Sequence, residues 1–106
     1  MMETIKKAQQ MGTKVKELQE ELVETEIEAE SANGAVTVVV SGAQVPISVT
    51  VTDELLAKGA AAVSEAVTEA TKEAHLNSQE YAKDRMTAMY AEIGLPLPPN
   101  AGPTGA

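Results

Sequence analysis

The stretch from Val23 to Thr52, VETEIEAESANGAVTVVVSGAQVPISVTVT, decides the predicted fold because its apolar residues recur at every second position. Two turn signals, Ala32-Asn33-Gly34 and Gly42-Ala43-Gln44, divide it into three segments. The predicted strands span residues 23–31, 36–41 and 45–52. Short connections join antiparallel neighbours, so we expect a three-stranded antiparallel β-meander. One face would be Val and Ile and must be covered, whereas the other would be Glu, Thr and Ser and can meet water.

Helical periodicity precedes this stretch, from about Thr4 to Val23. Apolar residues there fall three and four apart, which places them on one stripe of a helix. The stripe consists of Ala8, Met11, Val15, Leu18 and Leu22. We therefore predict an N-terminal helix that packs on the sheet or on a second subunit.

Helical periodicity also follows the stretch, after a predicted N-cap at Asp53. One apolar stripe starts at Val63, and another runs through Ala82, Met86, Met89 and Ile93. The second of these lies about 120° around the helix from the first. The pattern predicts either two helices or one long helix kinked near Asn77-Ser78, where Asn77 and Glu80 have capping-box spacing. The predicted fold class is α+β: an N-terminal helix, the meander and a long or kinked C-terminal helix.

The last apolar stripe predicts a dimer contact. We expect the two helices to cover the small sheet, which leaves this stripe without a surface to cover in its own chain. A second subunit is the simplest partner, with Met86, Met89 and Ile93 as the predicted interface. We therefore expect a homodimer.

The length of 106 residues is that of one small domain, which we place at residues 1–93. Residues 94–106 combine four prolines with three glycines. Such a composition predicts a disordered tail.

The composition speaks against an enzyme. The chain has no Cys and a single histidine, His75, with no sequence-local partner to orient it. The glutamates between Glu17 and Glu24 lie mostly off the apolar stripe and are expected to be solvated, so we predict no metal and no cofactor. There is no membrane-length apolar run and no basic-then-apolar leader, so a cytosol-like compartment is expected.

The charges are segregated along the chain. There are 8 Lys+Arg against 16 Asp+Glu, a net charge of −8, which at first argues against nucleic acid. Residues 4–16, however, carry +4, and residues 17–30 carry −7. The basic candidates are Lys6, Lys7, Lys14 and Lys16, followed in the C-terminal helix by Lys83 and Arg85. On charge alone, a solvated helix surface is the preferred interpretation of these lysines.

Several motifs occur in a recognisable order. KAQQM at 7–11 and LQEEL at 18–22 lie in the first helix, and RM at 85–86 and GLP at 94–96 lie near the end. The strand region holds EAES at 28–31, GAVTV at 34–38 and SG at 41–42. This set spans about residues 5–97 and resembles the YbaB/EbfC family of nucleoid-associated proteins.

The resemblance implies a non-enzymatic homodimer with protruding helices that binds double-stranded DNA with little or modest sequence preference. It also implies a cytoplasmic, nucleoid-associated location. The ending GLPLPP at 94–99 is similar to the cyanobacterial and plastid branch, so the plastid stroma is the alternative location.

The departures from the family pattern favour a helical DNA contact. Family members commonly carry basic residues where Thr37, Ile47 and Ser48 stand here. Acids at 24, 26, 28 and 30 on the open sheet face should repel DNA, so contacts are expected from Lys6, Lys7, Lys14 and Lys16, and more weakly from Lys83 and Arg85. Binding is expected to be weak and salt-sensitive. The alternative is a dimeric protein–protein interaction or adaptor module whose DNA binding is weak or lost.

Overall fold

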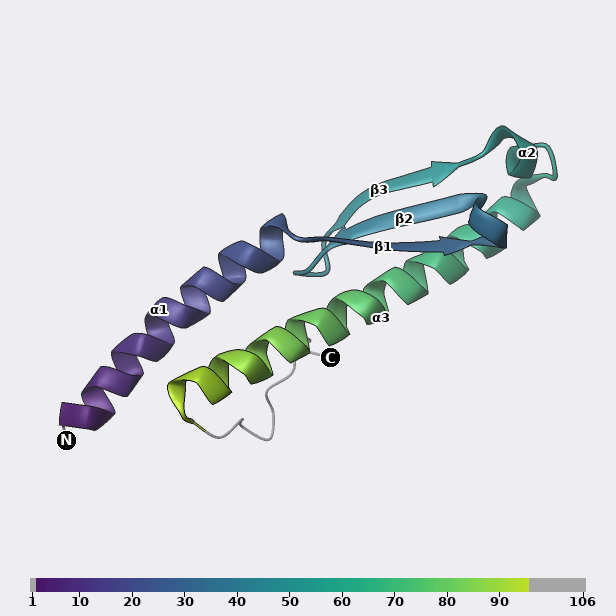
Figure 1. The fold of residues 1–106 in the computed structure, drawn as a ribbon. Helices are drawn as coiled ribbons and strands as arrows, with labels where there is room; N and C mark the ends of the chain where they lie inside the picture. Colours follow the sequence, from purple (N-terminus) through teal and green to yellow (C-terminus); the bar gives the residue numbers. More distant parts are fainter. Residues whose placement is uncertain (1, 96–106) are drawn as a thin grey trace.

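The computed structural model describes residues 2–95, which form an elongated α+β unit (Figure 1). In chain order the elements are α1 (Met2–Glu24), β1 (Glu26–Ser31), the 3₁₀ turn η1 (Ala32–Gly34), β2 (Val36–Ser41), β3 (Pro46–Val51), α2 (Asp53–Leu56) and α3 (Ala60–Ile93). The extents are 65 × 23 × 18 Å. The predicted order of helix, three strands and long helix is confirmed. The prediction of a Pro/Gly-rich tail falls, apart from Gly94 and Leu95, outside the described residues.

The three strands form the predicted antiparallel meander, in the order β1-β2-β3. Ala29 pairs with Val38 and Val38 with Val49, so these three side chains share one face. α3 packs on this face over β1 and β2. The buried residues of the resulting core are Ala29, Val36, Val38, Val40, Leu55, Ala66, Ala70 and Ala74.

α3 is one uninterrupted helix, so the alternative of a break or a kink near Asn77-Ser78 is wrong. Its buried face is a ladder of small residues four apart, namely Ala66, Ala70, Ala74, Ser78 and Ala82. Ser78 is fully buried, and its hydroxyl donates to the Ser41 carbonyl at 2.7 Å. Because this polar group has its partner, the helix continues through the position where the apolar pattern is interrupted.

The last apolar stripe, which runs through Ala82, Met86, Met89 and Ile93, packs against another part of the same chain. Within residues 2–95, α3 covers most of the apolar sheet face, while α1 lies alongside the C-terminal half of α3 (Figure 1). Met89 and Ala82 are buried there against Leu18 and Leu22 of α1. The premise that this stripe has no surface to cover in its own chain is therefore wrong: the stripe rotates around α3 because α3 serves two partners in succession, first the sheet and then α1.

The joint between α1 and the sheet is tight. Gly42 lies in the β2–β3 turn, where a side chain would come within 3.0 Å of the Leu22 carbonyl oxygen and 3.1 Å of a Leu22 methyl group. The Gly42 amide also donates to the Thr25 carbonyl at 2.9 Å. A glycine is needed here because the backbones approach so closely.

Two details of the predicted boundaries are wrong. Thr52, not Asp53, caps α2: its hydroxyl accepts from the Leu55 amide at 3.3 Å. A hydroxyl one residue earlier reaches the orphan amide of the first turn, which leaves Asp53 as the first helical residue. Glu24 ends α1 and so does not belong to the sheet. No helix in the described part of the chain has the length and apolar character of a membrane span.

Candidate nucleic-acid interface

α1 and the end of α3 form a two-helix arm in which α1 reaches farther. Ion pairs join Lys14 to Glu92 and Glu21 to Arg85, so the two helices run antiparallel. In this register, the residues of α1 before about Met11 extend past the C-terminal end of α3 (Figure 1). This free segment carries Lys6 and Lys7.

Arg85 is held by a bidentate contact to α1. Its Nε and Nη2 donate to the two carboxylate oxygens of Glu21 at 2.7 and 3.0 Å. The Tyr81 hydroxyl donates to the same carboxylate at 3.3 Å. The Arg85 hydrogen bonds have the largest effect and hold the pKa of Glu21 below its ordinary value. Desolvation opposes them with the second-largest effect, and the charge of Arg85 and the Tyr81 hydroxyl lower the pKa further. Arg85 is thus committed to joining α1 and α3.

Lys14 is held in the same way, closer to the tip of the arm. Its ammonium lies 3.0 Å from Glu92 and 3.9 Å from Glu17. The hydrogen bond to Glu92, then the charges of Glu92 and Glu17, raise the pKa of Lys14 above its ordinary value. Two of the six predicted contact residues therefore already face carboxylates.

The other four predicted cations are free. Each is exposed, and none forms an ion pair with any residue between 2 and 95; they are Lys6, Lys7, Lys16 and Lys83. On the outer face of α1, a shallow hollow of about 370 Å³ is lined by Lys6, Gln9, Gln10, Thr13 and Lys14. Ammonium and amide groups are donors suited to phosphate and sugar oxygens.

The open face of the sheet is acidic, as predicted. Glu26, Glu28 and Glu30 are exposed on the side away from α3. Thr37 and Ser48 share this face, and neither brings a positive charge to it. This surface repels a polyanion.

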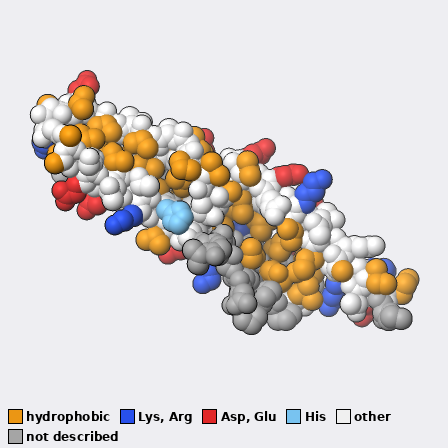
Figure 2. Space-filling view, turned by 180° about the vertical axis from the view of Figure 1, so that it is seen from behind, with side chains coloured by type: hydrophobic (Ala, Val, Ile, Leu, Met, Phe, Trp, Pro, Cys, Tyr) orange, Lys and Arg blue, Asp and Glu red, His pale blue; other side chains and the backbone are white. Residues whose placement is uncertain are grey.

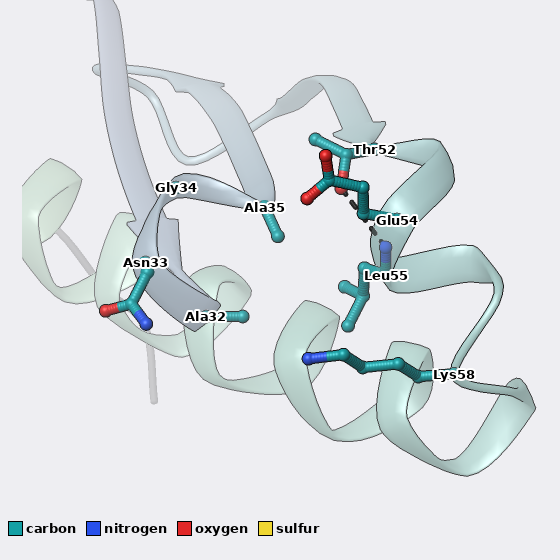
Figure 3. Close-up of a pocket in the computed structure, with 8 residues that line it drawn as sticks. All are labelled: Ala32, Asn33, Gly34, Ala35, Thr52, Glu54, Leu55 and Lys58. Carbon is teal, nitrogen blue, oxygen red and sulfur yellow. Dashed lines mark hydrogen bonds between the residues drawn. The ribbon is translucent and has the colours of Figure 1, made fainter.

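A pocket of about 320 Å³ (Figure 3) lies beside α2, at the end of the molecule away from the arm (Figure 1). It is bounded by the η1 turn, Thr52 and α2. The carboxylate of Glu54 and the ammonium of Lys58 lie on opposite sides of Leu55. The Thr52 hydroxyl at this pocket accepts from the Leu55 amide at 3.3 Å. His75 is exposed on α3 and lies outside this pocket.

The structure pairs two of the candidate cations, Lys14 and Arg85, with carboxylates that the sequence did not indicate. Lys14 and Glu92 are 78 positions apart, and Glu21 and Arg85 are 64 apart, so no local spacing signals either pair. Both helices carry basic and acidic residues, which is compatible with many pairings.

Comparison with known proteins gives consistent results. The sequence model described as the YbaB/EbfC DNA-binding family matches residues 1–93. A nucleoid-associated protein of Gloeothece citriformis is 42% identical over 96 residues, covering 91% of this chain and 84% of its own. Another from Synechocystis sp. has the same identity and coverage, and one from Nostoc punctiforme is 43% identical over 94 residues, covering 89% of this chain and 82% of its own.

A solved structure shares the fold. It is an uncharacterized protein of Helicobacter pylori, with a TM-score of 0.65 and 22% identity, and the match covers 74% of this chain and 93% of that one. At this identity the match speaks for the fold alone.

Proposed function

The chain belongs to the YbaB/EbfC DNA-binding family, and we propose that it is a homodimeric nucleoid-associated protein that binds the backbone of duplex DNA without catalysis and with little sequence preference. Relatives named as nucleoid-associated proteins support a location on the nucleoid in the cytoplasm. These relatives come from cyanobacteria, and a plastid location stays a prediction from the sequence ending.

The observation that carries this proposal is the free basic segment of α1. Lys6 and Lys7 lie beyond the end of α3, and Lys16 lies farther along the same helix. Their ammonium groups face no carboxylate among the described residues, so a phosphate can approach them without displacing an internal partner. Lysine contacts of this kind neutralise phosphates but read no base edges, which is why we expect little sequence preference.

Lys14 and Arg85 take a secondary place in this proposal. Each would have to exchange a carboxylate for a phosphate. Arg85 has two hydrogen bonds to lose, whereas Lys14 is an exposed point charge that can turn more freely. Lys83 is free but lies on α3, away from the tip of the arm.

The test is a salt-titrated DNA-binding measurement on Lys6→Glu/Lys7→Glu. If about six phosphates are neutralised per dimer, wild-type affinity falls by roughly three decades between 50 and 200 mM salt. The variant should bind at least about tenfold more weakly at low salt and show a salt slope lower by about four per dimer. Lys58→Glu/Lys72→Glu is the matched control, because it changes the net charge equally at exposed sites away from α1. Equal loss in both variants, or no binding by the wild type at low salt, contradicts the proposal.

One observation favours a second candidate, a dimeric protein–protein interaction or adaptor module. The open sheet face is acidic, and two of the six predicted cations are engaged within the chain. A basic protein partner would suit that face. Retention of a protein partner by the wild type after nuclease treatment, together with no DNA binding at low salt, would support this alternative.

A further inference from the structure

The loop between β2 and β3 holds a residue other than glycine in the left-handed backbone region. Gln44 has a φ of +62°. The loop is closed by the Gln44 amide, which donates to the Ser41 carbonyl at 3.0 Å, and by the Ser41 amide, which donates to the Val45 carbonyl at 2.8 Å. In a hairpin loop of this kind the last residue is left-handed, and glycine is the residue that adopts this conformation without strain. A glutamine persists at such a position where surrounding contacts hold it.

The Gln44 side chain fastens the loop to the middle of α3. Its Nε2 donates to the Gly42 carbonyl at 2.8 Å and to the Ser78 hydroxyl at 3.2 Å. The Ser78 hydroxyl in turn donates to the Ser41 carbonyl at 2.7 Å. Ser41 and Ser78 are both buried. Hydrogen bonds among buried groups specify one arrangement, so this network fixes the loop against α3.

The opposite side of the same loop holds the end of α1 (Figure 1). The Gly42 amide donates to the Thr25 carbonyl at 2.9 Å. Thr25 donates its amide and its hydroxyl to the Glu21 carbonyl of α1, at 2.9 and 2.7 Å. Ala43 packs against the apolar cluster that includes Leu22. The loop therefore lies between α1 and α3 at the base of the arm and touches both helices.

Farther along the arm, the contact between α1 and α3 is looser. Of the 23 residues of α1, two are buried, Leu18 and Leu22. The ion pairs of Lys14 and Arg85 are solvent-exposed, and exposed pairs restrain a helix only weakly. Figure 2 shows hydrophobic side chains exposed over the arm as well as over the sheet-bearing half of the molecule. The direction of α1 is thus fixed most firmly at its base.

We propose that Gln44 is a positioning residue for DNA binding. Through Ser78 and Gly42 it holds the base of α1 at a set angle to α3, and so determines where Lys6 and Lys7 meet the duplex. The inference rests on the proposed function for its consequence and on the contacts of the loop for its mechanism. An arm whose direction is set before binding loses less conformational freedom when it meets DNA.

The length of α1 amplifies a small movement at its base. Lys7 lies about 27 Å along the helix from Thr25, so a tilt of about 10° at the base displaces Lys7 by about 5 Å. This displacement exceeds the length of a hydrogen bond. A half-buried residue that does not itself reach DNA is thereby able to govern which phosphates the lysines meet.

The test variant is Gln44→Gly, which removes the side chain and leaves a residue suited to the left-handed backbone. Gln44→Asn is a second variant that also tolerates this backbone and keeps a side-chain amide, but it is one methylene too short to reach Ser78. Asn33→Gly is the matched control. It makes the same kind of change at another left-handed residue, with a φ of +56°, in the connection between β1 and β2.

The first measurement is independent of DNA. Residual dipolar couplings report the orientation of each helix, and in the wild type one alignment should fit both α1 and α3. In Gln44→Gly and Gln44→Asn the couplings of α1 should be scaled down relative to those of α3, whereas Asn33→Gly should match the wild type. A single alignment that fits both helices in the Gln44 variants, or an equal change in Asn33→Gly, overturns the proposal.

The second measurement is DNA affinity at low salt. Both Gln44 variants should bind about three- to tenfold more weakly than the wild type, because the arm must be ordered on binding. Their salt dependence should keep the wild-type slope, because the same lysines neutralise the same phosphates. Loss of stability alone would not produce this result, and chemical denaturation of Gln44→Gly should remain close to that of the wild type. Wild-type affinity in the Gln44 variants overturns the proposal.

A double-variant comparison tests the route through Ser78. Ser78→Ala fits the ladder of small residues on α3 and removes the hydroxyl that Gln44 contacts. Gln44→Gly should then weaken DNA binding no further, and a full additional loss contradicts the link. A wild type that binds no DNA at low salt would instead contradict the proposed function, and the dipolar couplings would still decide whether Gln44 holds α1.

Discussion

The two halves of α1 follow one helical pattern but differ in their contacts with the rest of the chain. Residues 14–24 pack on α3, bury Leu18 and Leu22, and tie Lys14 and Glu21 into ion pairs. Residues 2–13 extend along and then past the end of α3 and leave Ile5 and Lys6 exposed. Whether a charged or apolar side chain of α1 is paired, buried or exposed therefore depends on how far α3 extends alongside it. The packed half should govern stability, and the free half should govern DNA binding.

The largest expected effect lies in the packed half. Leu22→Ala removes a buried side chain at the joint of α1, α3 and the β2–β3 turn, and should lower the free energy of unfolding by about 2–4 kcal/mol. Ile5→Ala is the matched control, since Ile5 is exposed and should cost less than about 0.5 kcal/mol. Chemical denaturation of both variants is the measurement. Similar losses in the two would remove the distinction between the halves.

The next effect comes from the close approach at Gly42. Gly42→Ala introduces a methyl group 3.0 Å from the Leu22 carbonyl, and the backbone there cannot move aside easily. We expect a loss of about 1–3 kcal/mol, measured by denaturation. Gly12→Ala is the control: nothing lies within 4 Å of the added methyl group, and the helix should gain stability from the better helix former. An unchanged Gly42→Ala stability would show that α1 is not fixed against the turn.

The ion pair at the base of the arm should contribute less, with a defined pH dependence. The pKa of Glu21 is lowered in the folded chain, so its contribution is present above its ordinary pKa of 4.5 and is lost as the pH falls through the lowered value. Glu21→Gln should cost under about 1 kcal/mol at neutral pH and flatten the acid side of the stability curve. Thermal melts across pH 3 to 7 provide the measurement. A wild-type curve with the same acid limb as the variant would contradict the pairing.

The smallest effect should appear in DNA binding. Glu92→Gln frees Lys14 from its carboxylate, and should raise affinity at low salt about two- to fivefold above that of Glu20→Gln, which removes the same charge from an unpaired exposed site. A titration with a fluorescent duplex would resolve the two variants. Equal affinities would mean that Lys14 takes no part in binding.

Much of the fold could be predicted from the sequence because the signals were local. The alternation of Val36, Val38 and Val40 specified the buried face of β2, and the turn residues specified the meander. The stripe shift along α3 was also visible. Its cause was not, since Asn77 and Glu80 suggested a helix start there, whereas Ser78 becomes a buried hydrogen-bond donor because Ser41 lies beside it.

The candidate site was predictable as a list of cations but not as a surface. Lys6 and Lys14 look alike in sequence, yet one is free and the other faces Glu92. Tyr81 and Tyr90 of α3 are both half-buried against the α1–α3 core.

The sequence by itself determined the elements and the separation of charge along the chain, because hydrophobic period, turn residues and charge runs act over neighbouring positions. The tertiary structure alone decided which cations are free and which surface each stripe of α3 covers. These depend on segments up to 78 positions apart, brought together by the length of α3 and by the close approach at Gly42.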